Sequence, residues 1–278
     1  MNIKILADSS ANLYHLEGVD FESVPLKIST DEREFVDDIN LDVYEMATYL
    51  ANYKGASRTS CPNVGEWLEA FGDADIVYCV TIISTLSGSY NAALVAKAQY
   101  EEEHPDRKVF VLDSYSAGPE PKLIVEKIRD LVLEGKDFDT VCKEVVDYKE
   151  NHTSLNFCLE SLKNLANNGR VPHAVASLAS LIGLRLVGNV SEDGQIQPTD
   201  KARGAKKANA TIYKCMKKEG YCGGTVVIDH CFNEEAANML KNTIKEEYPD
   251  ANVRIERTTG LCSFYAEKGG LMIGIEVN

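Results

Sequence analysis

The sequence predicts an α/β protein. We expect an N-terminal three-layer α/β/α domain with a mostly parallel sheet, then a C-terminal two-layer α+β domain with a mixed sheet. The chain has 278 residues, which suits two domains better than one. In the first half, short apolar runs alternate with helical patterns, which is typical of βαβ units. The order in the second half is less regular. We place the boundary near Asn151, giving domains at 1–151 and 152–278.

In the first domain, each expected strand is a short apolar run with a polar turn or a helical pattern nearby. The expected strands are Ile3–Ala7, Val24–Ile28, Asp75–Ile82 and Lys108–Leu112. The expected helices are Leu41–Tyr53, Val64–Phe71, Tyr90–Glu103, Pro121–Glu134 and Phe138–Asn151. The polar segment Ser57–Asn63 is expected to be a loop, and Trp67 is expected in the core.

In the second domain, strands and helices follow each other without strict alternation. The expected strands are Leu155–Cys158, Leu184–Val190, Gln195–Gln197, Thr225–Ile228, Val253–Glu256 and Leu271–Val277. The expected helices are Leu159–Ala166, Ala174–Gly183, Gly204–Lys218 and Glu234–Glu247. The turn Glu192-Asp193-Gly194 predicts a strand pair on either side of it.

The composition excludes several classes of partner. The formal net charge is −14, and such a chain repels nucleic-acid phosphates and anionic membranes. No segment reaches the roughly 18 apolar residues of a membrane span. The first residues indicate a strand rather than a signal peptide, so we expect a cytoplasmic protein. The eight cysteines show neither CxxC pairs nor zinc-site spacing, so no metal site is expected.

Signatures of common enzymes are also missing. The sequence contains no GxGxxG, P-loop, HExxH or GxSxG pattern. Nucleotide binding, zinc proteolysis and ordinary α/β-hydrolase chemistry are therefore disfavoured.

Small hydroxyl residues gather just after the expected strands. Asp8-Ser9-Ser10, Ser84–Ser89 and Asp113-Ser114 each follow one. Ligands of open α/β sheets bind beyond the carboxyl ends of the strands, so these groups should share a crevice. The Ser87-Gly88-Ser89 turn leads into a helix, whose first N–H groups suit an anion. The alternative is that these serines only cap the helix.

Taken together, these segments resemble the DegV family of fatty-acid-binding proteins. The resemblance extends from end to end, and its ordered combination is more specific than any one piece. The matching segments are Asp8-Ser9-Ser10, Arg58–Pro62, Ile83–Tyr90, Asp113-Ser114, Leu162–Leu165, Asn168–Val171 and Asp193–Gly204.

The resemblance implies a long-chain fatty acid, such as palmitate, in a tunnel between the domains. Its carboxylate would meet hydroxyl and backbone N–H donors at Thr59, Ser60, Ser87, Gly88 and Ser89. The resemblance further implies a protein that is not itself an enzyme and needs no cofactor. Such a chain could present its ligand to a separate fatty acid kinase subunit that carries the ATP.

Other residues are candidates for contacts with the head group or the partner. They are Ser9, Ser114, Arg170, Arg203, His230 and Glu267. The chain also departs from the family pattern: Cys61 stands where glutamine is usual, and Glu267 stands in the best register for a family histidine. A glutamate beside a carboxylate would be repulsive unless protonated or turned away. His230 could take the place of that histidine.

Two alternatives stay open. One is a serine-dependent acyl hydrolase or transferase that uses Ser87 or Ser114 with His230. The other is a non-catalytic regulatory protein that lost the kinase partnership. A basic stretch could be either a solvated helix face or a docking surface for an acidic partner. It comprises Lys201, Arg203, Lys206, Lys207, Lys214, Lys217 and Lys218.

Overall fold

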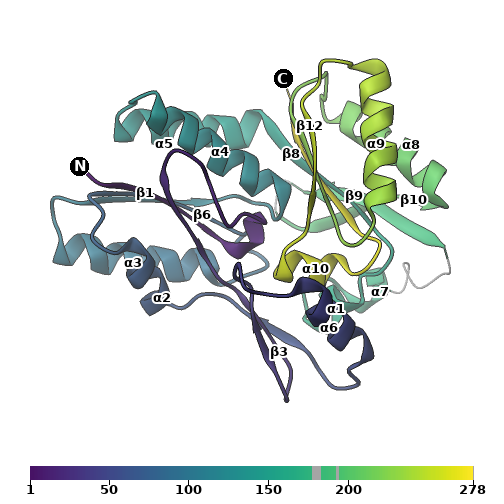
Figure 1. The fold of residues 1–278 in the computed structure, drawn as a ribbon, viewed down its shortest axis with the longest axis horizontal. Helices are drawn as coiled ribbons and strands as arrows, with labels where there is room; N and C mark the ends of the chain where they lie inside the picture. Colours follow the sequence, from purple (N-terminus) through teal and green to yellow (C-terminus); the bar gives the residue numbers. More distant parts are fainter. Residues whose placement is uncertain (177–182, 192–193, 278) are drawn as a thin grey trace.

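A computed structural model of the chain describes residues 1–176, 183–191 and 194–277. Within these ranges it has a four-stranded, a six-stranded and a three-stranded sheet (Figure 1). We call residues 1–151 the N-terminal lobe and residues 152–277 the C-terminal lobe. The predicted α/β class, with a parallel first sheet and a mixed second sheet, is confirmed.

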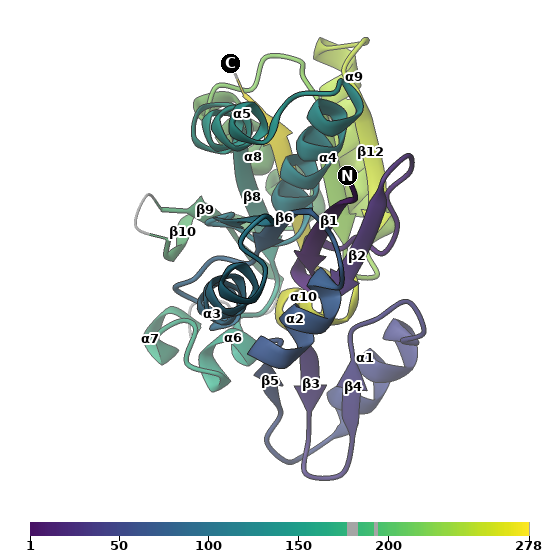
Figure 2. The ribbon, with the colours of Figure 1, turned by 90° about the vertical axis from the view of Figure 1, so that its left-hand side faces the viewer.

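The four-stranded sheet of the N-terminal lobe is parallel throughout, in the order β2-β1-β6-β7. Its strands are β1 (Ile3–Asp8), β2 (Asp20–Val24), β6 (Ile76–Thr81) and β7 (Lys108–Asp113). Helices cover both faces, as Figure 2 shows from the side. They are α2 (Val64–Phe71) and α3 (Ser89–Glu103) on one face, and α4 (Pro119–Leu133) and α5 (Phe138–Asn151) on the other.

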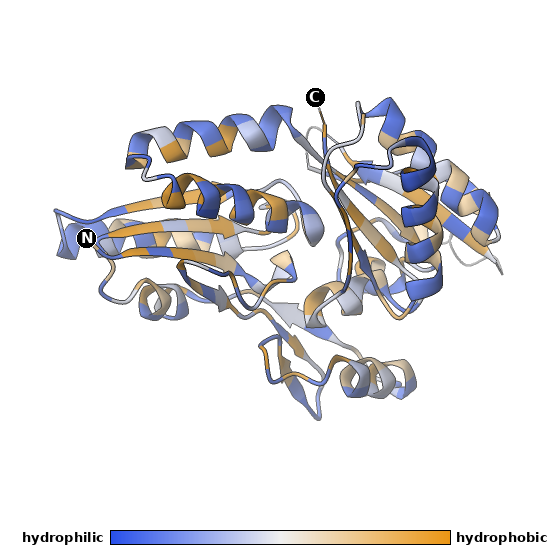
Figure 3. Cartoon of the chain, turned by 45° about the horizontal axis from the view of Figure 1, so that its top comes forward, coloured by the Kyte–Doolittle hydropathy of each residue, from blue (hydrophilic) through white to orange (hydrophobic). Residues whose placement is uncertain are grey.

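Alternating side chains of these strands fill two separate cores, since successive residues of a strand point to opposite faces. Ile5 and Tyr78 pack toward α4 and α5. Leu6 and Val77 pack toward α2 and α3, together with the buried Trp67. Figure 3 shows the apolar colouring that results along the strands. Strands buried on both faces read as continuous apolar runs, which is why the sequence located β1, β6 and β7 but not β2.

The six-stranded sheet of the C-terminal lobe has the order β10-β9-β8-β13-β11-β12. Its strands are β8 (Thr153–Leu159), β9 (Leu184–Val190), β10 (Ile196–Arg203), β11 (Val226–His230), β12 (Val253–Arg257) and β13 (Leu271–Glu276). Only the β11–β12 pair is parallel among these strands. Helices α8 (Ala205–Lys218) and α9 (Glu234–Glu247) cover one face. The other face is turned toward the N-terminal lobe and the remaining helices, α6 (Lys163–Asn167), α7 (His173–Ala176) and α10 (Gly260–Ala266).

The three-stranded sheet was not predicted. It is antiparallel, in the order β4-β3-β5, with β3 (Lys27–Ser29), β4 (Glu34–Val36) and β5 (Arg58–Ser60). The expected strand Val24–Ile28 was wrong, because the end of β2 and the start of β3 share that stretch. The expected loop Ser57–Asn63 contains β5. Strands this short show too little alternation to be recognised. Helix α1 (Val43–Asn52) lies beside this sheet (Figure 2).

The second lobe brings further corrections. The expected helix Leu159–Ala166 was wrong at its start, since Leu159 ends β8 and α6 begins at Lys163. Strand β10 runs well beyond the expected Gln195–Gln197. Helix α10 was not predicted at all. The expected Ala174–Gly183 helix and the expected Glu192-Asp193-Gly194 turn lie partly outside the described residues.

Buried polar contacts join the two lobes. Lys122 of α4 has a side chain only 1% exposed, and its Nζ lies 2.6 Å from a Glu256 oxygen and 3.3 Å from Asp229 Oδ1. Asn12 donates to Asp229 Oδ2 at 2.6 Å. Burial alone would lower the pKa of Lys122, but the carboxylates of Asp229 and Glu256 outweigh it and raise that pKa. The ammonium group therefore stays charged between the lobes.

We expect Lys122→Met to lower the free energy of unfolding by about 3 kcal/mol or more, because Asp229 would remain buried with its charge uncompensated. Urea denaturation measures this. The control is Lys97→Met, which removes a half-exposed ion pair with Glu101 and should change stability by less than about 1 kcal/mol. Equal effects of the two variants would contradict the role of Lys122.

Glu120, in the first turn of α4, is a buried carboxyl group next to Thr153, whose hydroxyl donates to it at 2.8 Å. Burial raises its pKa to about 7, against the opposing hydrogen bond from Thr153. The folded state therefore binds this proton more tightly than the unfolded state. The protonated Glu120 carboxyl therefore stabilises the folded state fully below its pKa in the unfolded chain, and this stabilisation is lost as the pH rises to about 7.

The free energy of unfolding of Glu120→Gln relative to the wild type should therefore increase by about 3 kcal/mol as the pH rises from 4.5 to 7. It should not increase further above pH 7. Denaturation curves at a series of pH values test this. The exposed Glu103→Gln is the control, with a difference expected to stay within about 0.5 kcal/mol. A stability gap for Glu120→Gln that does not vary with pH would contradict the assignment.

Candidate functional site

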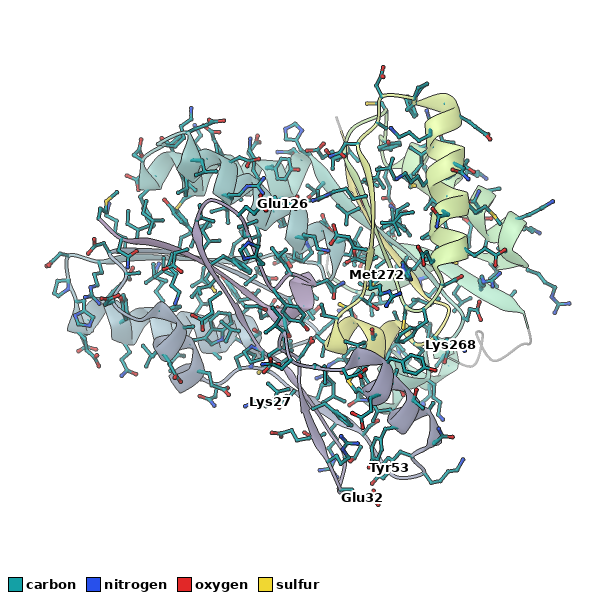
Figure 4. The ribbon with its side chains drawn as sticks, viewed as in Figure 1. Lys27, Glu32, Tyr53, Glu126, Lys268 and Met272 are labelled. Carbon is teal, nitrogen blue, oxygen red and sulfur yellow. The ribbon has the colours of Figure 1, made fainter. Side chains whose placement is uncertain are left out.

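A cavity of about 280 Å³ lies between the lobes, and its wall is mainly apolar. The N-terminal lobe contributes Leu26 and the loop after β6. The C-terminal lobe contributes β8, β13, the β9–β10 hairpin, α6 and α10. The apolar lining residues include Ile82, Ile83, Leu86, Ala117, Leu155, Phe157, Leu159, Leu165, Val190, Ile196, Leu261 and Met272. Met272 is labelled in Figure 4, near the centre of the molecule.

Strand β8 shows why the cavity wall is apolar. Leu155, Phe157 and Leu159 alternate along the strand and line the cavity. Cys158 points the other way, into the core beneath α8. Because side chains of a strand alternate between the two faces, one strand supplies both a core and a cavity wall.

One part of the wall is polar. Thr59 and Ser60 of β5 line it, together with Ser87 and Gly88 in the turn before α3. Tyr265 of α10 completes this group, with its hydroxyl 2.7 Å from Thr59 Oγ1. The cavity thus has a group of hydroxyls at one place and a mainly apolar wall elsewhere.

The Thr59–Tyr265 pair has one proton to spare. Two hydroxyls carry two protons, and their mutual hydrogen bond uses one. Burial raises the pKa of Tyr265, although Thr59 and Arg170 oppose that rise. The phenol therefore stays protonated near neutral pH, and the pair can donate the second proton to an acceptor in the cavity.

The Ser87-Gly88 turn approaches the cavity closely. Gly88 is the residue before α3 and provides no side-chain cap. A side chain at Gly88 would meet Cys61, because its Cβ would lie 3.3 Å from the Cys61 sulfur. Ser89 was also predicted to contact the carboxylate, but its buried hydroxyl donates to Asp8 at 2.6 Å. The Ser89 side chain therefore binds Asp8 inside the N-terminal lobe and does not line the cavity.

Ser9 and Ser114 also lie outside the cavity wall. The Ser9 hydroxyl accepts a hydrogen bond from the Leu26 N–H at 3.0 Å. The Ser114 hydroxyl donates to the carbonyl of Ser116 and accepts from its N–H, both at 3.1 Å. These serines shape the loops at the ends of β1 and β7.

The predicted arginines lie in different places. Arg170 lines the cavity, and its guanidinium donates to the Asn168 carbonyl at 2.6 Å. Arg203 is exposed at the end of β10 and does not line the cavity. Arg170 therefore places a positive charge at the cavity wall, whereas Arg203 lies on the surface beside the basic helix α8.

Glu267 and His230 are both turned to other partners. Glu267 accepts from the Ser161 hydroxyl at 2.8 Å and from the Asn164 N–H at 3.1 Å. His230 is buried, which lowers its pKa, and its Nδ1 accepts from the Asn233 N–H at 3.1 Å. Neither residue lines the cavity, so Glu267 does not oppose an anion there.

The hydrolase alternative needs a serine hydrogen-bonded to a base. Among the described hydrogen bonds, neither Ser87 nor Ser114 donates to His230, and the Ser114 hydroxyl is already engaged with Ser116. The arrangement provides donors for an anion rather than an activated nucleophile.

Tyr265 is the site residue that the sequence did not reveal. Its partner Thr59 lies 206 residues away in the chain. Helix α10 is buried on nearly all sides, so it shows no amphipathic period. The available signal was a phenol inside an otherwise apolar stretch, where a buried hydroxyl needs a partner.

The described residues form neither a metal-binding cluster nor a membrane-spanning helix. Within the described ranges, no three His, Cys, Asp or Glu side chains are grouped so that they could hold a metal ion. No helix in the part of the chain that the structure describes has the length and apolarity to cross a membrane.

Known proteins resemble this chain along its full length. The DegV family model, described as an uncharacterised protein family, matches residues 2–277. A DegV domain-containing protein of Streptococcus pneumoniae strain R6 is 41% identical over 282 residues, covering 100% of both chains.

Two solved structures are similar in both sequence and fold. One is a DegV family protein from Eubacterium eligens loaded with heptadecanoic acid, with a TM-score of 0.96, 41% identity and coverage of 99% of this chain and 100% of that one. The other is the Streptococcus pneumoniae Fatty Acid Kinase (Fak) B3 protein loaded with linoleic acid, with a TM-score of 0.98, 41% identity and full coverage of both chains. The chain belongs to the DegV family.

Proposed function

We propose that this protein binds a long-chain fatty acid in the cavity between its lobes. The carboxylate meets Thr59, Ser60 and the Ser87-Gly88 turn, with Tyr265 as a further donor. The observation that carries the proposal is a largely apolar cavity whose wall includes a cluster of neutral hydroxyl groups. An ionised carboxylate only accepts hydrogen bonds, so a cluster of donors suits it.

The tail provides most of the affinity. Burial is worth about 0.8 kcal/mol per CH₂, so the fourteen methylenes of hexadecanoic acid give about 11 kcal/mol as an upper bound. The loss of translational freedom and the ordering of the chain cost several kcal/mol of that. A hydrogen bond to a charged group adds about 1.5–3 kcal/mol. The hydroxyls therefore set the orientation and the choice of head group.

The relatives support a role as a carrier rather than as an enzyme. Similar structures are loaded with heptadecanoic and linoleic acid, and one is named as a component of a fatty acid kinase. We infer that this chain holds the acid while a separate kinase subunit supplies ATP. Arg170 at the cavity wall would then lie near the carboxylate when the partner acts on it.

Two predictions remain proposals. We expect the bound fatty acid to be the only small molecule that the protein needs. We also expect a cytoplasmic location, which fits a partner that uses ATP. A regulatory protein that lost the kinase partnership is the second candidate. The argument for it was repulsion between Glu267 and the carboxylate, and this argument is weaker because Glu267 binds Ser161 and Asn164 and does not line the cavity.

The double variant Thr59→Ala/Ser87→Ala should bind hexadecanoic acid at least tenfold more weakly, because it loses two donors to the carboxylate. Competition against a fluorescent fatty acid measures this on delipidated protein. Native mass spectrometry of the undelipidated wild type should show a bound host fatty acid.

Ser84→Ala is the control, because Ser84 lies near the same turn but does not line the cavity. Thermal unfolding should show that the double variant folds. Unchanged affinity would remove Thr59 and Ser87 from the site. A wild type that neither carries nor binds fatty acid would refute the function.

The exposed basic surface formed by Arg203, Lys206 and Lys207 should dock the kinase subunit. Changing all three to glutamate should abolish co-sedimentation with a purified fatty acid kinase catalytic subunit, because the surface charge is reversed. Affinity for hexadecanoic acid should stay within about twofold, since none of the three lines the cavity.

The matched control reverses three exposed lysines of the N-terminal lobe, Lys54, Lys108 and Lys136. That variant should co-sediment with the kinase subunit as the wild type does. Equal loss of docking in both triple variants would mean that net charge, rather than this surface, governs the association.

A further inference from the structure

The position of Tyr265 depends on α10, which has only seven residues. A helix this short is not stable by itself, so its place is set by contacts with the rest of the protein. Four of its residues, Leu261, Cys262, Tyr265 and Ala266, line the cavity. Whatever holds α10 therefore also holds one wall of the cavity and one of its hydroxyl donors.

Asp37 holds the start of this helix. It follows β4 and has an exposed fraction of 0%. Its Oδ1 accepts from the Gly260 N–H at 2.6 Å, and its Oδ2 accepts from the Leu261 N–H at 2.8 Å. The residue before the helix, Thr259, makes no capping bond of its own. A carboxylate 223 residues away in the chain thus takes the role that a local cap usually has.

The surroundings of Asp37 leave it little freedom. The Tyr14 hydroxyl donates to its Oδ1 at 2.6 Å. Gly260 must lack a side chain, because a Cβ there would lie 2.7 Å from Asp37 Oδ1 and 2.5 Å from a Leu41 methyl group. A buried carboxylate is tolerated only when its acceptor sites are satisfied, and here several donors converge on it.

Asp37 directly follows a strand of the small sheet that contains Thr59. Strand β3 pairs with both neighbours, so that Ile28 lies opposite Phe35 of β4 and opposite Thr59 of β5. Asp37 follows β4 directly and contacts the first residues of α10, whereas Thr59 contacts Tyr265 near its last residue. The three-stranded sheet therefore contacts α10 at both ends.

The opposite side of α10 is held separately. The Asn164 side-chain amide of α6 donates to the Phe264 carbonyl at 2.8 Å. This contact belongs to the C-terminal lobe and fixes α10 to the helix next to it. On the N-terminal lobe, the Thr259 N–H donates to Asn12 Oδ1 at 3.0 Å and the Cys262 thiol donates to the Ser10 carbonyl at 3.4 Å. The contacts of Asp37 and Thr59 relate α10 directly to the three-stranded sheet.

We propose that Asp37 is a positioning residue for the head-group site: by binding the first N–H groups of α10, it keeps the Tyr265 hydroxyl at hydrogen-bond distance from Thr59. This role rests on the proposed function, because it assumes that the Thr59–Tyr265 pair receives a carboxylate. Asp37 does not itself line the cavity.

The test compares hexadecanoic acid with 1-hexadecanol, which have the same tail but different head groups. The measured quantity is the ratio of the two Kd values, obtained by competition against a fluorescent fatty acid. In Asp37→Asn, one helix N–H loses its acceptor, and the preference for the acid should fall about tenfold. Binding of the alcohol should change less than threefold, because the apolar wall remains.

Tyr265→Phe should lower the preference by a similar factor. In the double variant Asp37→Asn/Tyr265→Phe the loss should be no larger than in either single variant, because both act through the same hydroxyl. The control is Asp38→Asn, the adjacent carboxylate, which accepts from the Asn40 N–H and has no hydrogen bond to α10 among those described. It should leave the preference unchanged.

Two outcomes would overturn the role of Asp37. One is an equal loss of affinity for acid and alcohol in Asp37→Asn, which would indicate a purely structural effect. The other is an additive loss in the double variant. If Asp37→Asn does not fold, Tyr14→Phe, which removes one donor to Asp37, is read by the same two criteria. A wild type with no preference for the acid would instead refute the proposed head-group site.

Discussion

The rest of the structure depends on the buried contact of Lys122 and Asn12 with Asp229. One face of the six-stranded sheet is apolar and turned toward the other lobe, so exposing it would be unfavourable. The two lobes must therefore stay together while leaving a space between them. Directional polar contacts contribute to this, together with apolar clusters that include residues of both lobes, such as Ile83 with Leu261 and Ile28 with Phe264. The cavity is thus a property of how the lobes are joined.

The proposed head-group site combines neutral hydroxyls with one cationic side chain, Arg170, at the cavity wall. The Thr59 and Tyr265 hydroxyls satisfy each other by a hydrogen bond, so neither of them is left without a partner when the site is empty. A fixed ammonium group would instead have to be desolvated in the empty protein. This arrangement suits a carrier, which must release its ligand as well as bind it.

The sequence located elements whose own pattern is strong. The helices Val64–Phe71 and Phe138–Asn151 were predicted with their observed ends, because a capping residue and a clear period mark each. The three-stranded sheet was missed, since strands of three residues hardly show alternation. Among the candidate residues, Thr59 and Ser87 proved to line the cavity. Tyr265 could not be inferred, because its role arises from a contact between segments 206 residues apart.

Trp67, the single tryptophan, has a further consequence. It is packed inside the N-terminal lobe beside Phe71, away from the residues that line the cavity. The fluorescence emission of Trp67 should therefore change when the packing around α2 is lost, and should stay nearly constant when lipid binds. Tryptophan fluorescence can thus report whether the N-terminal lobe is folded, independently of whether the cavity holds a ligand.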